Sequence, residues 1–357
     1  MASPKPITIV GGGLAGLTLG IGLRQRGIPA AVWEAGDYPR HRVCGEFISG
    51  NGLAVLQRLG LRTLLDQAGA VSLSSAAFVS GTNRSPVRQM PSPALGLSRY
   101  RLDATLAEEF QRLGGELHTG SRRNPFGVPA DSSGAGPEAF SDGVVRAAGR
   151  RPQPTENGWR WFGLKAHATN VDLAADLEMH ISASHYIGVN RIDRGEVNIC
   201  GLFRQRAGEA SEAGFDLLHG KPGTPLHERL ASARFDKTSL CSVAGLSLKP
   251  RRAADKTECC IGDSITMIPP VTGNGMSMAF ESAELSIAPL ARYSRGEIAW
   301  AEARETIARA CDAAFAERLA WARRLQWLMF SSVLRTPVGK FLLNWDGIWN
   351  FLFTKTR

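Results

Sequence analysis

The sequence lacks the cysteine and histidine spacings that are typical of metal sites and disulfide-rich proteins. Its six cysteines include no C-x-x-C pair and several lie within apolar runs, so free thiols and a cytoplasmic location are predicted. No zinc-ligand spacing is found, and no metal site is predicted. No segment is long and apolar enough to cross a bilayer. The apolar N-terminal stretch is rich in glycine, which argues against an export signal.

Nucleic-acid-binding signatures are also absent. The net charge is +9 over 357 residues, but Lys and Arg are dispersed, and pairs such as Arg150-Arg151 are the densest clusters. The charge is therefore interpreted as solvated surface, and no nucleic-acid partner is predicted. With 43% apolar and 21% charged residues, the chain has the composition of an ordinary globular protein, and its length suggests two or three structural units.

The first 34 residues are the most informative part of the chain. Residues 7–10 are predicted to form a short buried strand, and residues 30–33 a second strand that ends on Glu34. A glycine-rich turn and an apolar helix lie between them, an order typical of a dinucleotide-binding unit. A carboxylate at Glu34 can accept hydrogen bonds from both ribose hydroxyls and would repel a 2′-phosphate, which favours bound FAD or NAD over NADP.

The turn between these strands reads G-x-G-x-x-G. Gly11 lets the chain turn tightly, Gly13 lets the backbone approach a pyrophosphate, and Gly16 lets the helix pack closely on the strand. The helix that begins at Leu14 and Ala15 presents free N–H groups and the positive end of its dipole to the phosphates. These five residues are predicted cofactor contacts.

A second glycine-rich segment lies far along the chain. Gly262 and Asp263 follow a predicted strand, and Asp263 can accept hydrogen bonds from a polyol chain, which FAD has and NAD lacks. The helix that follows can stabilise negative charge on a reduced flavin with its N-terminus. The segment therefore shifts the prediction to FAD. Its other predicted cofactor contacts are Pro270, Gly273, Asn274, Gly275 and Met276.

In the order of these motifs, the chain resembles the FAD-dependent oxidoreductases of the p-hydroxybenzoate hydroxylase and geranylgeranyl reductase type, over nearly its whole length. Arg99-x-x-Leu102-Asp103 is similar to a family element whose arginine lies near the FAD. The segment from Arg42 through Cys44 to Glu46 is similar to the Cys-Gly segment of the reductase branch, which passes near the flavin. The resemblance implies that Arg42 and Arg99 contact FAD.

Two motifs of this family are altered here. Asp142-Gly143 lacks the serine that follows the D-G motif of hydroxylases, a motif linked to FAD and NAD(P)H binding. The W-x-W-x-I-P motif of flavin-dependent halogenases has only a partial counterpart in Trp159-Arg160-Trp161, and the strand expected to match it reads differently at residues 186–190, which argues against halogenation. No second G-x-G-x-x-G occurs, so a nicotinamide donor is expected to bind transiently.

The predicted fold class is α/β with an α+β insertion: a discontinuous Rossmann-like FAD-binding domain, an antiparallel-sheet substrate domain and a helical C-terminal tail. A β-hairpin formed by residues 185–190 and 197–200 is the clearest element of the substrate domain. Residues 122–141, rich in Ser, Gly and Pro, are interpreted as a mobile surface loop. The predicted domain bounds are 1–75, 99–150 and 245–295 for FAD binding, 76–98 and 155–244 for substrate, and 296–357 for the tail.

Four residues are candidate catalytic groups. Cys44 either lines the flavin pocket or is a small buried residue, and direct thiol chemistry is less favoured. Glu46 either contacts substrate or flavin or is a solvated surface group. Lys165 and His167 lie on a strand expected to face the substrate cavity. His167 has a pKa suited to proton transfer, although a single histidine on a sheet is more often structural.

The C-terminal tail has apolar side chains at helical spacing, flanked by Lys340, Lys355 and Arg357. Packing against the protein's own catalytic domain is the favoured interpretation. Peripheral contact with a membrane, which would suit a lipophilic substrate, is the alternative. The apolar positions are Val338, Phe341, Leu342, Trp345, Ile348, Trp349 and Leu352.

These observations predict an FAD-dependent oxidoreductase of secondary metabolism that acts on an apolar or aromatic small molecule, with NAD(P)H as transient electron donor. The fold resemblance favours an oxygen-dependent hydroxylase, whereas the segment Cys44-Gly45-Glu46 favours reduction of a double bond. Halogenation and a non-catalytic flavin-binding role are the less favoured alternatives.

Overall fold

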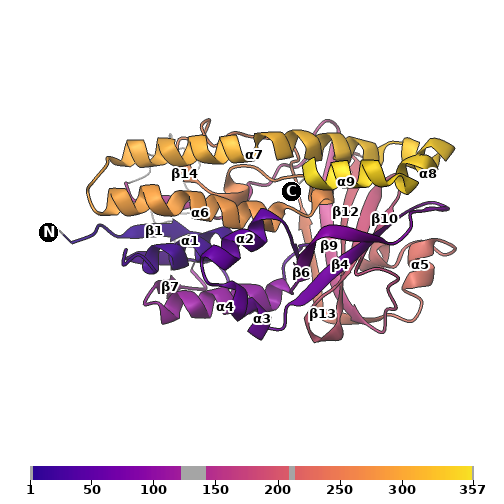
Figure 1. Ribbon diagram of the computed structural model, residues 1–357, viewed down its shortest axis with the longest axis horizontal. Coiled ribbons are helices and arrows are strands. Elements are labelled where there is room, and N and C mark those ends of the chain that lie inside the picture. The colour runs from indigo at the N-terminus through magenta and orange to yellow at the C-terminus, as the bar shows by residue number, and fades with distance from the viewer. Residues whose placement is uncertain (1–2, 122–141, 209–213, 356–357) are drawn as a thin grey trace.

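The computed structural model describes residues 3–121, 142–208 and 214–355. Two β-sheets lie side by side, and the long helix α7 (Trp300–Phe330) runs along both of them (Figure 1). The loop expected at residues 122–141 lies outside the described residues.

The first sheet is parallel and has the strand order β14-β8-β1-β2-β7. The strands predicted at residues 7–10 and 30–33 are confirmed with those bounds. Ile7, Ile9 and Val32 are fully buried, as expected for a parallel sheet. Its strands are β1 (Ile7–Val10), β2 (Ala30–Trp33), β7 (Glu116–His118), β8 (Val144–Arg146) and β14 (Cys259–Cys260).

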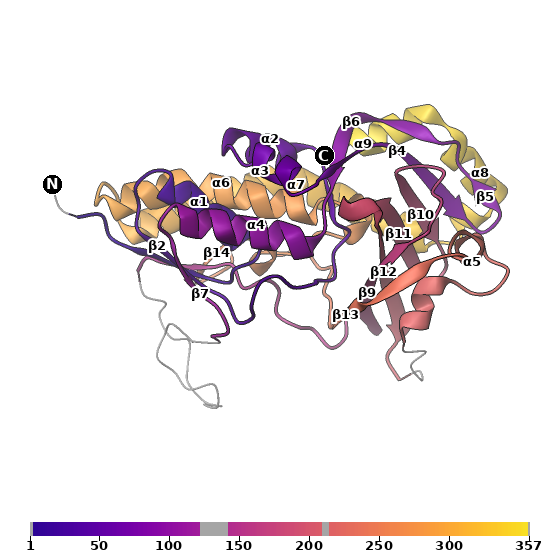
Figure 2. The same ribbon diagram turned by 90° about the horizontal axis from the view of Figure 1, so that it is seen from below.

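Helices cover one face of this sheet, as Figure 2 shows for α1, α4 and α6. Close packing depends on glycines of α1. A Cβ on Gly20 would lie 2.7 Å from Phe110 of α4, and one on Gly22 would lie 2.2 Å from Ile287 of α6. Ser98 caps α4 by accepting a hydrogen bond from the Arg101 N–H. The helices are α1 (Leu14–Arg24), α2 (Asn51–Arg58), α3 (Arg62–Gln67), α4 (Arg99–Arg112) and α6 (Gly275–Ser294).

The second sheet has nine strands in the order β13-β9-β12-β11-β10-β4-β6-β3, with β5 paired to β4. The predicted hairpin is confirmed as β11 and β12. The sheet is mixed rather than antiparallel throughout, because β4 and β10 pair in parallel. The strands are β3 (Phe47–Ile48), β4 (Val71–Ser80), β5 (Asn83–Arg84), β6 (Arg88–Gly96), β9 (Trp159–Thr169), β10 (Leu177–Ile181), β11 (His185–Arg191), β12 (Val197–Arg206) and β13 (Arg234–Ala244).

Some local predictions differ from the structure. The sequence also predicts helices at about residues 209–219 and 226–233. The first is, in its described part, only the 3-10 helix η2 (Phe215–His219). The next helix, α5 (Pro225–Arg229), ends four residues before the predicted end at residue 233. The edge strand β13 was not predicted, because its residues lack a regular alternation of apolar and polar side chains.

The C-terminal region is helical, as predicted. The first half of α7 buries Ala303 and Ile307 in the core of the first unit, and its end buries Met329 and Phe330 against the second sheet. After the turn η5 (Val333–Arg335), helices α8 (Pro337–Asn344) and α9 (Asp346–Lys355) lie over the second sheet (Figure 1). Among the described residues, no helix has the length and apolar character needed to span a membrane.

Candidate active site

A cavity of about 1040 Å³ lies where the two sheets meet. Gly11, Gly13 and Glu34 line it from the first glycine-rich turn, and Asp263 and Gly273 line it from the second. The fold therefore brings both predicted nucleotide motifs, from opposite ends of the sequence, to a single cavity.

The three glycines of the first turn have different tasks. Gly11 has a φ of 110°, and a Cβ there would lie 2.4 Å from the Ala147 carbonyl oxygen. A Cβ on Gly16 would lie 1.9 Å from the Gly11 carbonyl oxygen. By contrast, no atom lies within 4 Å of the position of a Cβ on Gly13. The fold thus requires Gly11 and Gly16, whereas Gly13 leaves space at the cavity wall for a ligand to approach the backbone.

Two helix N-termini face the cavity without a side-chain cap. Helix α1 begins after Gly13, with Leu14 and Ala15 lining the cavity, and α6 begins at Gly275. The first N–H groups of a helix lack intrahelical acceptors and attract anions. The predicted contact Met276 also lines the cavity in the first turn of α6, beside the 3-10 turn η4 (Pro270–Thr272). Of the same segment, Asn274 is buried as the residue before this helix.

Glu34 is held in place at the carboxyl end of β2. It is 7% exposed and accepts hydrogen bonds from the Gly12 N–H at 2.8 Å and the Gly36 N–H at 3.1 Å. Arg40 forms an ion pair with it at 2.5 Å, and Arg42 a longer one at 3.4 Å. These four contacts fix the orientation of the Glu34 carboxylate at the wall of the cavity.

Arg42 and Arg99 both line the cavity and share one carboxylate. Arg99 binds Asp103 through two hydrogen bonds of 2.6 and 2.8 Å, one turn along α4. The Nε atom of Arg42 lies 3.3 Å from the same carboxylate. Asp103 is fully buried, so its role is to orient these two guanidinium groups toward the cavity.

Asp263 lies in the 3-10 turn η3 (Gly262–Ser264), directly after β14, and lines the cavity. Burial raises the pKa of Asp263 to about 6, against the influence of Arg150 and Arg99. Gly262 has a φ of 58°, and a Cβ there would lie 2.9 Å from the Ala15 side chain. This glycine therefore lets η3 approach α1 and carries Asp263 to the nucleotide motif.

The pair Asp142-Gly143 is not at the cavity. It precedes β8, where the Gly143 carbonyl accepts a hydrogen bond from the Thr8 N–H. Ligands of parallel sheets bind at the carboxyl ends of the strands, and at that end of β8 the chain reads Ala147-Ala148, followed by Gly149. The residues of this segment that reach the cavity are therefore Ala147, Ala148 and Gly149, and not Asp142 or Gly143.

A buried cluster of charged side chains borders the same cavity. Glu46 Oε1 lies 3.1 Å from Lys165 Nζ, and Glu46 Oε2 lies 2.6 Å from His167 Nε2. Glu46 and Lys165 are 0% exposed and His167 is 2% exposed. Lys165 and His167 lie two residues apart on β9 and therefore point to the same face of the sheet. Three of the four predicted catalytic residues are thus in direct contact.

The cluster extends in two directions. Lys165 Nζ lies 3.2 Å from Nδ1 of His41, which lines the cavity. His167 Nδ1 lies 3.4 Å from Glu196, whose side chain is 26% exposed. A chain of polar contacts therefore leads from the cavity, through Glu46 and His167, to the protein surface.

The pKa directions indicate the charge states of Glu46 and His41. Burial works to raise the pKa of Glu46, but the hydrogen bond to His167 and the charge of Lys165 outweigh it, and the pKa lies below its ordinary value. Burial, followed by the charge of Lys165, lowers the pKa of His41 to about 4. At neutral pH, Glu46 is therefore ionised and His41 is neutral, so His41 Nδ1 accepts a hydrogen bond from Lys165.

Glu46 also has an unusual backbone conformation. Its φ of 51° lies in the left-handed region, which a residue with a Cβ adopts at a cost. The Arg99 N–H donates to Glu46 Oε1 at 2.8 Å and holds the side chain in this position. Strained residues that surrounding contacts hold in place are typical of functional sites.

Cys44, the fourth candidate, lines the cavity, and its sulfur accepts a hydrogen bond from the Glu46 backbone N–H at 3.4 Å. Burial raises the pKa of its thiol, so the sulfur is protonated at neutral pH and poorly suited to attack as a thiolate. The Asn198 amide donates to the Cys44 carbonyl at 3.1 Å and anchors the loop. This geometry favours a pocket-lining role.

The other half of the cavity is apolar and lies between the second sheet and the C-terminal helices. Two residues of the strand that was compared with the halogenase motif, Tyr186 and Gly188, line this half. Trp159 and Trp161, the partial counterpart of that motif, do not. Its lining includes Phe78, Met90, Leu177, Met179, Ile181, Leu202, Val271, Leu328, Met329, Leu342, Ile348, Trp349 and Phe353.

His41, Glu196 and Arg40 were not among the predicted site residues. His41 and Arg40 belong to a loop without regular structure, and Glu196 lies in a hairpin turn. The one signal for His41 in the sequence is its position three residues before the Cys44-Gly45 segment.

Comparison with known proteins agrees with this geometry. Residues 5–139 match the family model of the FAD binding domain. PqsL from Pseudomonas aeruginosa, a probable FAD-dependent monooxygenase, is 15% identical with a TM-score of 0.69, covering 98% of this chain and 100% of PqsL. The flavin-dependent brominase Bmp2 is 16% identical with a TM-score of 0.68, covering 100% of this chain and 95% of Bmp2.

A third solved structure holds the cofactor: a variant of the halogenase PltM in complex with FAD is 16% identical with a TM-score of 0.70, covering 98% of this chain and 79% of PltM. No curated protein matches the sequence. The family match indicates an FAD-binding domain at residues 5–139, and the solved structures show that the whole chain has the fold of flavin-dependent enzymes. Its fold is the one shared by FAD-dependent monooxygenases and halogenases, of the p-hydroxybenzoate hydroxylase type.

Proposed function

We propose that the chain is a cytoplasmic, NAD(P)H-dependent FAD monooxygenase that hydroxylates an apolar or aromatic small molecule of secondary metabolism. In the overall reaction, substrate, dioxygen, NAD(P)H and a proton give hydroxylated substrate, water and NAD(P)⁺. The apolar half of the cavity suits such a substrate. All six cysteines are free thiols, which suits a reducing compartment.

The residues at the nucleotide end of the cavity fit FAD. We propose that Glu34 binds the ribose of the adenosine, that Gly13 and the start of α1 bind the pyrophosphate, and that Asp263 binds the ribitol; all of them line the cavity or begin at its wall. The start of α6 at Gly275 would then lie near the flavin ring, where its dipole would favour negative charge. Bound FAD supplies the two-electron redox chemistry.

The buried contact between Glu46 and His167 is the observation that carries the proposal. Hydroxylation of an aromatic ring releases a proton from the carbon that is attacked, and the phenol formed exchanges a proton as well. Glu46 lines the cavity, is ionised and lies 2.6 Å from His167, which in turn lies 3.4 Å from Glu196 near the surface. We propose that a proton passes from the cavity through Glu46 and His167 to Glu196.

Lys165 has a positioning role in this proposal. Its ammonium group is fully buried and donates to both Glu46 and His41. A fixed positive charge beside Glu46 keeps the carboxylate ionised between proton transfers. Lys165 does not line the cavity, so it acts through Glu46 rather than on the substrate.

The substrate class is supported by the shape and lining of the cavity. Arg88 and Asn190 are among the polar side chains that line the cavity beside many apolar ones, so an aromatic molecule with one polar group would fit. PqsL has been solved in complex with 2-aminobenzoylacetate, a small aromatic compound. We propose a substrate of similar size and polarity.

The dependence on oxygen tests the proposal. The FAD-loaded protein should oxidise NADH or NADPH faster when a suitable aromatic substrate is added, and should form hydroxylated product only in the presence of dioxygen. Product formed without oxygen at full rate would overturn the hydroxylase. Incorporation of bromide or chloride would instead identify a halogenase.

Reduction of a double bond is the second candidate. The loop from Cys44 to Glu46, similar to that of the reductase branch, lines the cavity. The proton path through Glu46 can also run inward and supply the proton that saturation of a double bond consumes together with a hydride. Anaerobic conversion of an activated alkene would select this function.

We also propose that the protein contacts membranes peripherally through its C-terminal helices. Among the described residues, the exposed large apolar side chains gather around these helices: Phe341 is 62% exposed, Trp345 53% and Phe351 47%. The inward side of the same helices lines the apolar half of the cavity with Leu342 and Trp349. The C-terminal helices are thus apolar on both sides, and their outer side suits contact with a lipid surface.

A further inference from the structure

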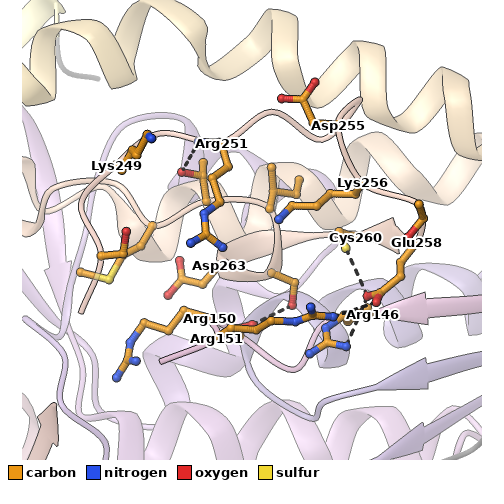
Figure 3. A pocket seen from close by; sticks show the side chains of 17 residues that line it. Arg146, Arg150, Arg151, Lys249, Arg251, Asp255, Lys256, Glu258, Cys260 and Asp263 are labelled. Carbon is orange, nitrogen blue, oxygen red and sulfur yellow. Dashed lines mark hydrogen bonds and ion pairs between the residues drawn. The ribbon is translucent and has the colours of Figure 1, made fainter. Parts of the chain in front are cut away.

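A second, smaller cleft adjoins the cavity on the side of β14, and it is strongly basic (Figure 3). Its volume is about 240 Å³, roughly a quarter of that of the main cavity. Six cationic side chains line it against three carboxylates, those of Asp255, Glu258 and Asp263. The cations are Arg146, Arg150, Arg151, Lys249, Arg251 and Lys256.

The cations of this cleft are only partly neutralised. Glu258 pairs with Arg146 at 3.3 Å and with Arg151 at 2.9 Å, at one end of the cleft. Among the described residues, Arg251 and Lys256 take part in no ion pair. Figure 3 shows both side chains extending over the cleft toward Asp263. The cleft therefore has an excess of positive charge over negative charge, directed at a space large enough for a phosphate group.

The cleft and the main cavity share part of their walls. Gly149, Arg150, Asp263 and Met267 line both. An anion in the cleft would thus lie beside the segment proposed to hold the ribitol of FAD. The pyrophosphate of FAD has its own partners elsewhere, at the start of α1 and at Arg42, which line only the main cavity.

We infer that the basic cleft binds a phosphate group of the nicotinamide dinucleotide that reduces the flavin, and this inference rests on the proposed function. The chain has no second G-x-G-x-x-G turn to hold a dinucleotide, so the donor needs another anion site. Arg251 and Lys256 supply charge-assisted hydrogen bonds to the phosphate. A donor held there reaches the flavin across the shared wall at Asp263.

Two phosphate sources are compatible with this chemistry: the pyrophosphate of either dinucleotide and the 2′-phosphate that only NADPH carries. Equilibrium binding of the oxidised forms, NAD⁺ and NADP⁺, to the FAD-loaded protein distinguishes them, because neither form reduces the flavin. The experiment uses isothermal titration calorimetry at two salt concentrations. The variants are Arg251→Gln and Lys256→Gln, and Arg62→Gln on the exposed side of α3 is the matched control.

Each cleft variant should weaken dinucleotide binding about tenfold and reduce its dependence on salt, while the FAD content and the melting temperature stay as in the parent protein. Loss of affinity for both dinucleotides would identify the pyrophosphate, and loss for NADP⁺ alone the 2′-phosphate. The control should bind both normally.

Three results would overturn the inference: unchanged binding of both dinucleotides in the cleft variants, loss of FAD instead of dinucleotide, or an equal loss in the Arg62→Gln control. Because the measurement involves neither substrate nor oxygen, it stands apart from the test of hydroxylation. A protein that binds NADP⁺ through Arg251 but forms no hydroxylated product would retain this site and lose the proposed reaction.

Discussion

The nucleotide end of the main cavity and the buried charge cluster beside it depend on different interactions. At the nucleotide end, backbone N–H groups at the starts of α1 and α6 face open space, and Gly13 leaves the wall bare. In the buried cluster that borders the cavity, the charges of Glu46, Lys165 and His167 satisfy one another. The nucleotide end thus offers hydrogen-bond donors to a ligand, whereas the cluster is held by contacts within the protein. Mutations should therefore affect binding at the first and stability at the second.

Lys165→Met should have the largest effect on stability. Removing one partner of a buried ion pair leaves an uncompensated charge, here on Glu46, and costs about 3–5 kcal/mol. Chemical denaturation of the FAD-free protein measures the loss. Lys237→Met, an exposed change on β13, is the control and should change stability little. A cost below about 1 kcal/mol for Lys165→Met would show that the cluster is not held by charge.

Glu46→Gln in the same cluster should separate activity from binding. A glutamine keeps the shape but cannot take up a proton, so kcat should fall about 100-fold or more while the FAD content is kept. Glu196→Gln, at the exposed end of the path, should lower kcat less. Equal kcat values for Glu46→Gln and the parent enzyme in steady-state assays would exclude the proton path.

Gly16→Ala and Gly13→Ala test the nucleotide end as a pair. The Cβ of Gly16→Ala would meet a backbone oxygen at 1.9 Å, so a loss of about 3 kcal/mol or more is expected. Gly13→Ala should cost less than about 1 kcal/mol, because no atom lies within 4 Å, yet FAD affinity should fall at least about tenfold. Thermal denaturation and titration with FAD measure the two quantities. Normal FAD affinity in Gly13→Ala would contradict the proposed approach of the pyrophosphate.

The pH dependence of the FAD-free protein should report on Asp263. Its pKa in the folded protein, about 6, lies above the ordinary value of 3.8, so the folded state binds the proton more tightly. The contribution of Asp263 to stability is therefore present below about pH 4 and is lost as the pH rises toward 6. Asp263→Asn should remove this part of the profile, measured by denaturation between pH 3.5 and 7, which range brackets both pKa values. An identical profile for the variant would assign the effect to other groups.

The smallest stability effect is expected on the outer face of the tail. Trp345→Ser changes an exposed side chain and should alter stability by less than about 0.5 kcal/mol, but it should weaken binding to vesicles that contain anionic lipid. Trp349→Ala is the matched change on the inner face, where Trp349 packs against Phe78, and should raise the KM for substrate. Flotation with vesicles measures the membrane binding of Trp345→Ser, and steady-state kinetics measure the KM of Trp349→Ala. Equal flotation of Trp345→Ser and the parent protein would exclude membrane contact through this face.

The nucleotide end could be predicted from sequence because its parts are local. Gly11, Gly13 and Gly16 lie within one turn, and the strand and helix that flank them can be recognised from short apolar segments. Asp263 could be placed for a similar reason, since it directly follows a strand. Both motifs reach the cavity as expected.

The proposed proton path through Glu46 and His167 could be predicted only in part from sequence, because its contacts depend on the register of a strand and on the path of a loop. Lys165 and His167 share a face of β9 by alternation, but their contact with Glu46 depends on how residues 41–46 cross the sheet. His41 and Glu196 have no periodic pattern around them. The basic cleft was missed for the same reason: Arg251 and Arg150 are far apart in sequence, and scattered arginines were interpreted as surface charge.

Helix α7 restricts how a substrate can enter. Its first half packs into the core of one unit and its last turns into the core of the other. A hinge motion that separates the two units would therefore disrupt the packing of α7. The short helices α8 and α9 close the apolar half of the cavity, and their described side chains pack only into the core of the second unit. Substrate should therefore enter, and product leave, by displacement of α8 and α9. The rate of this displacement would then set the upper limit of kcat.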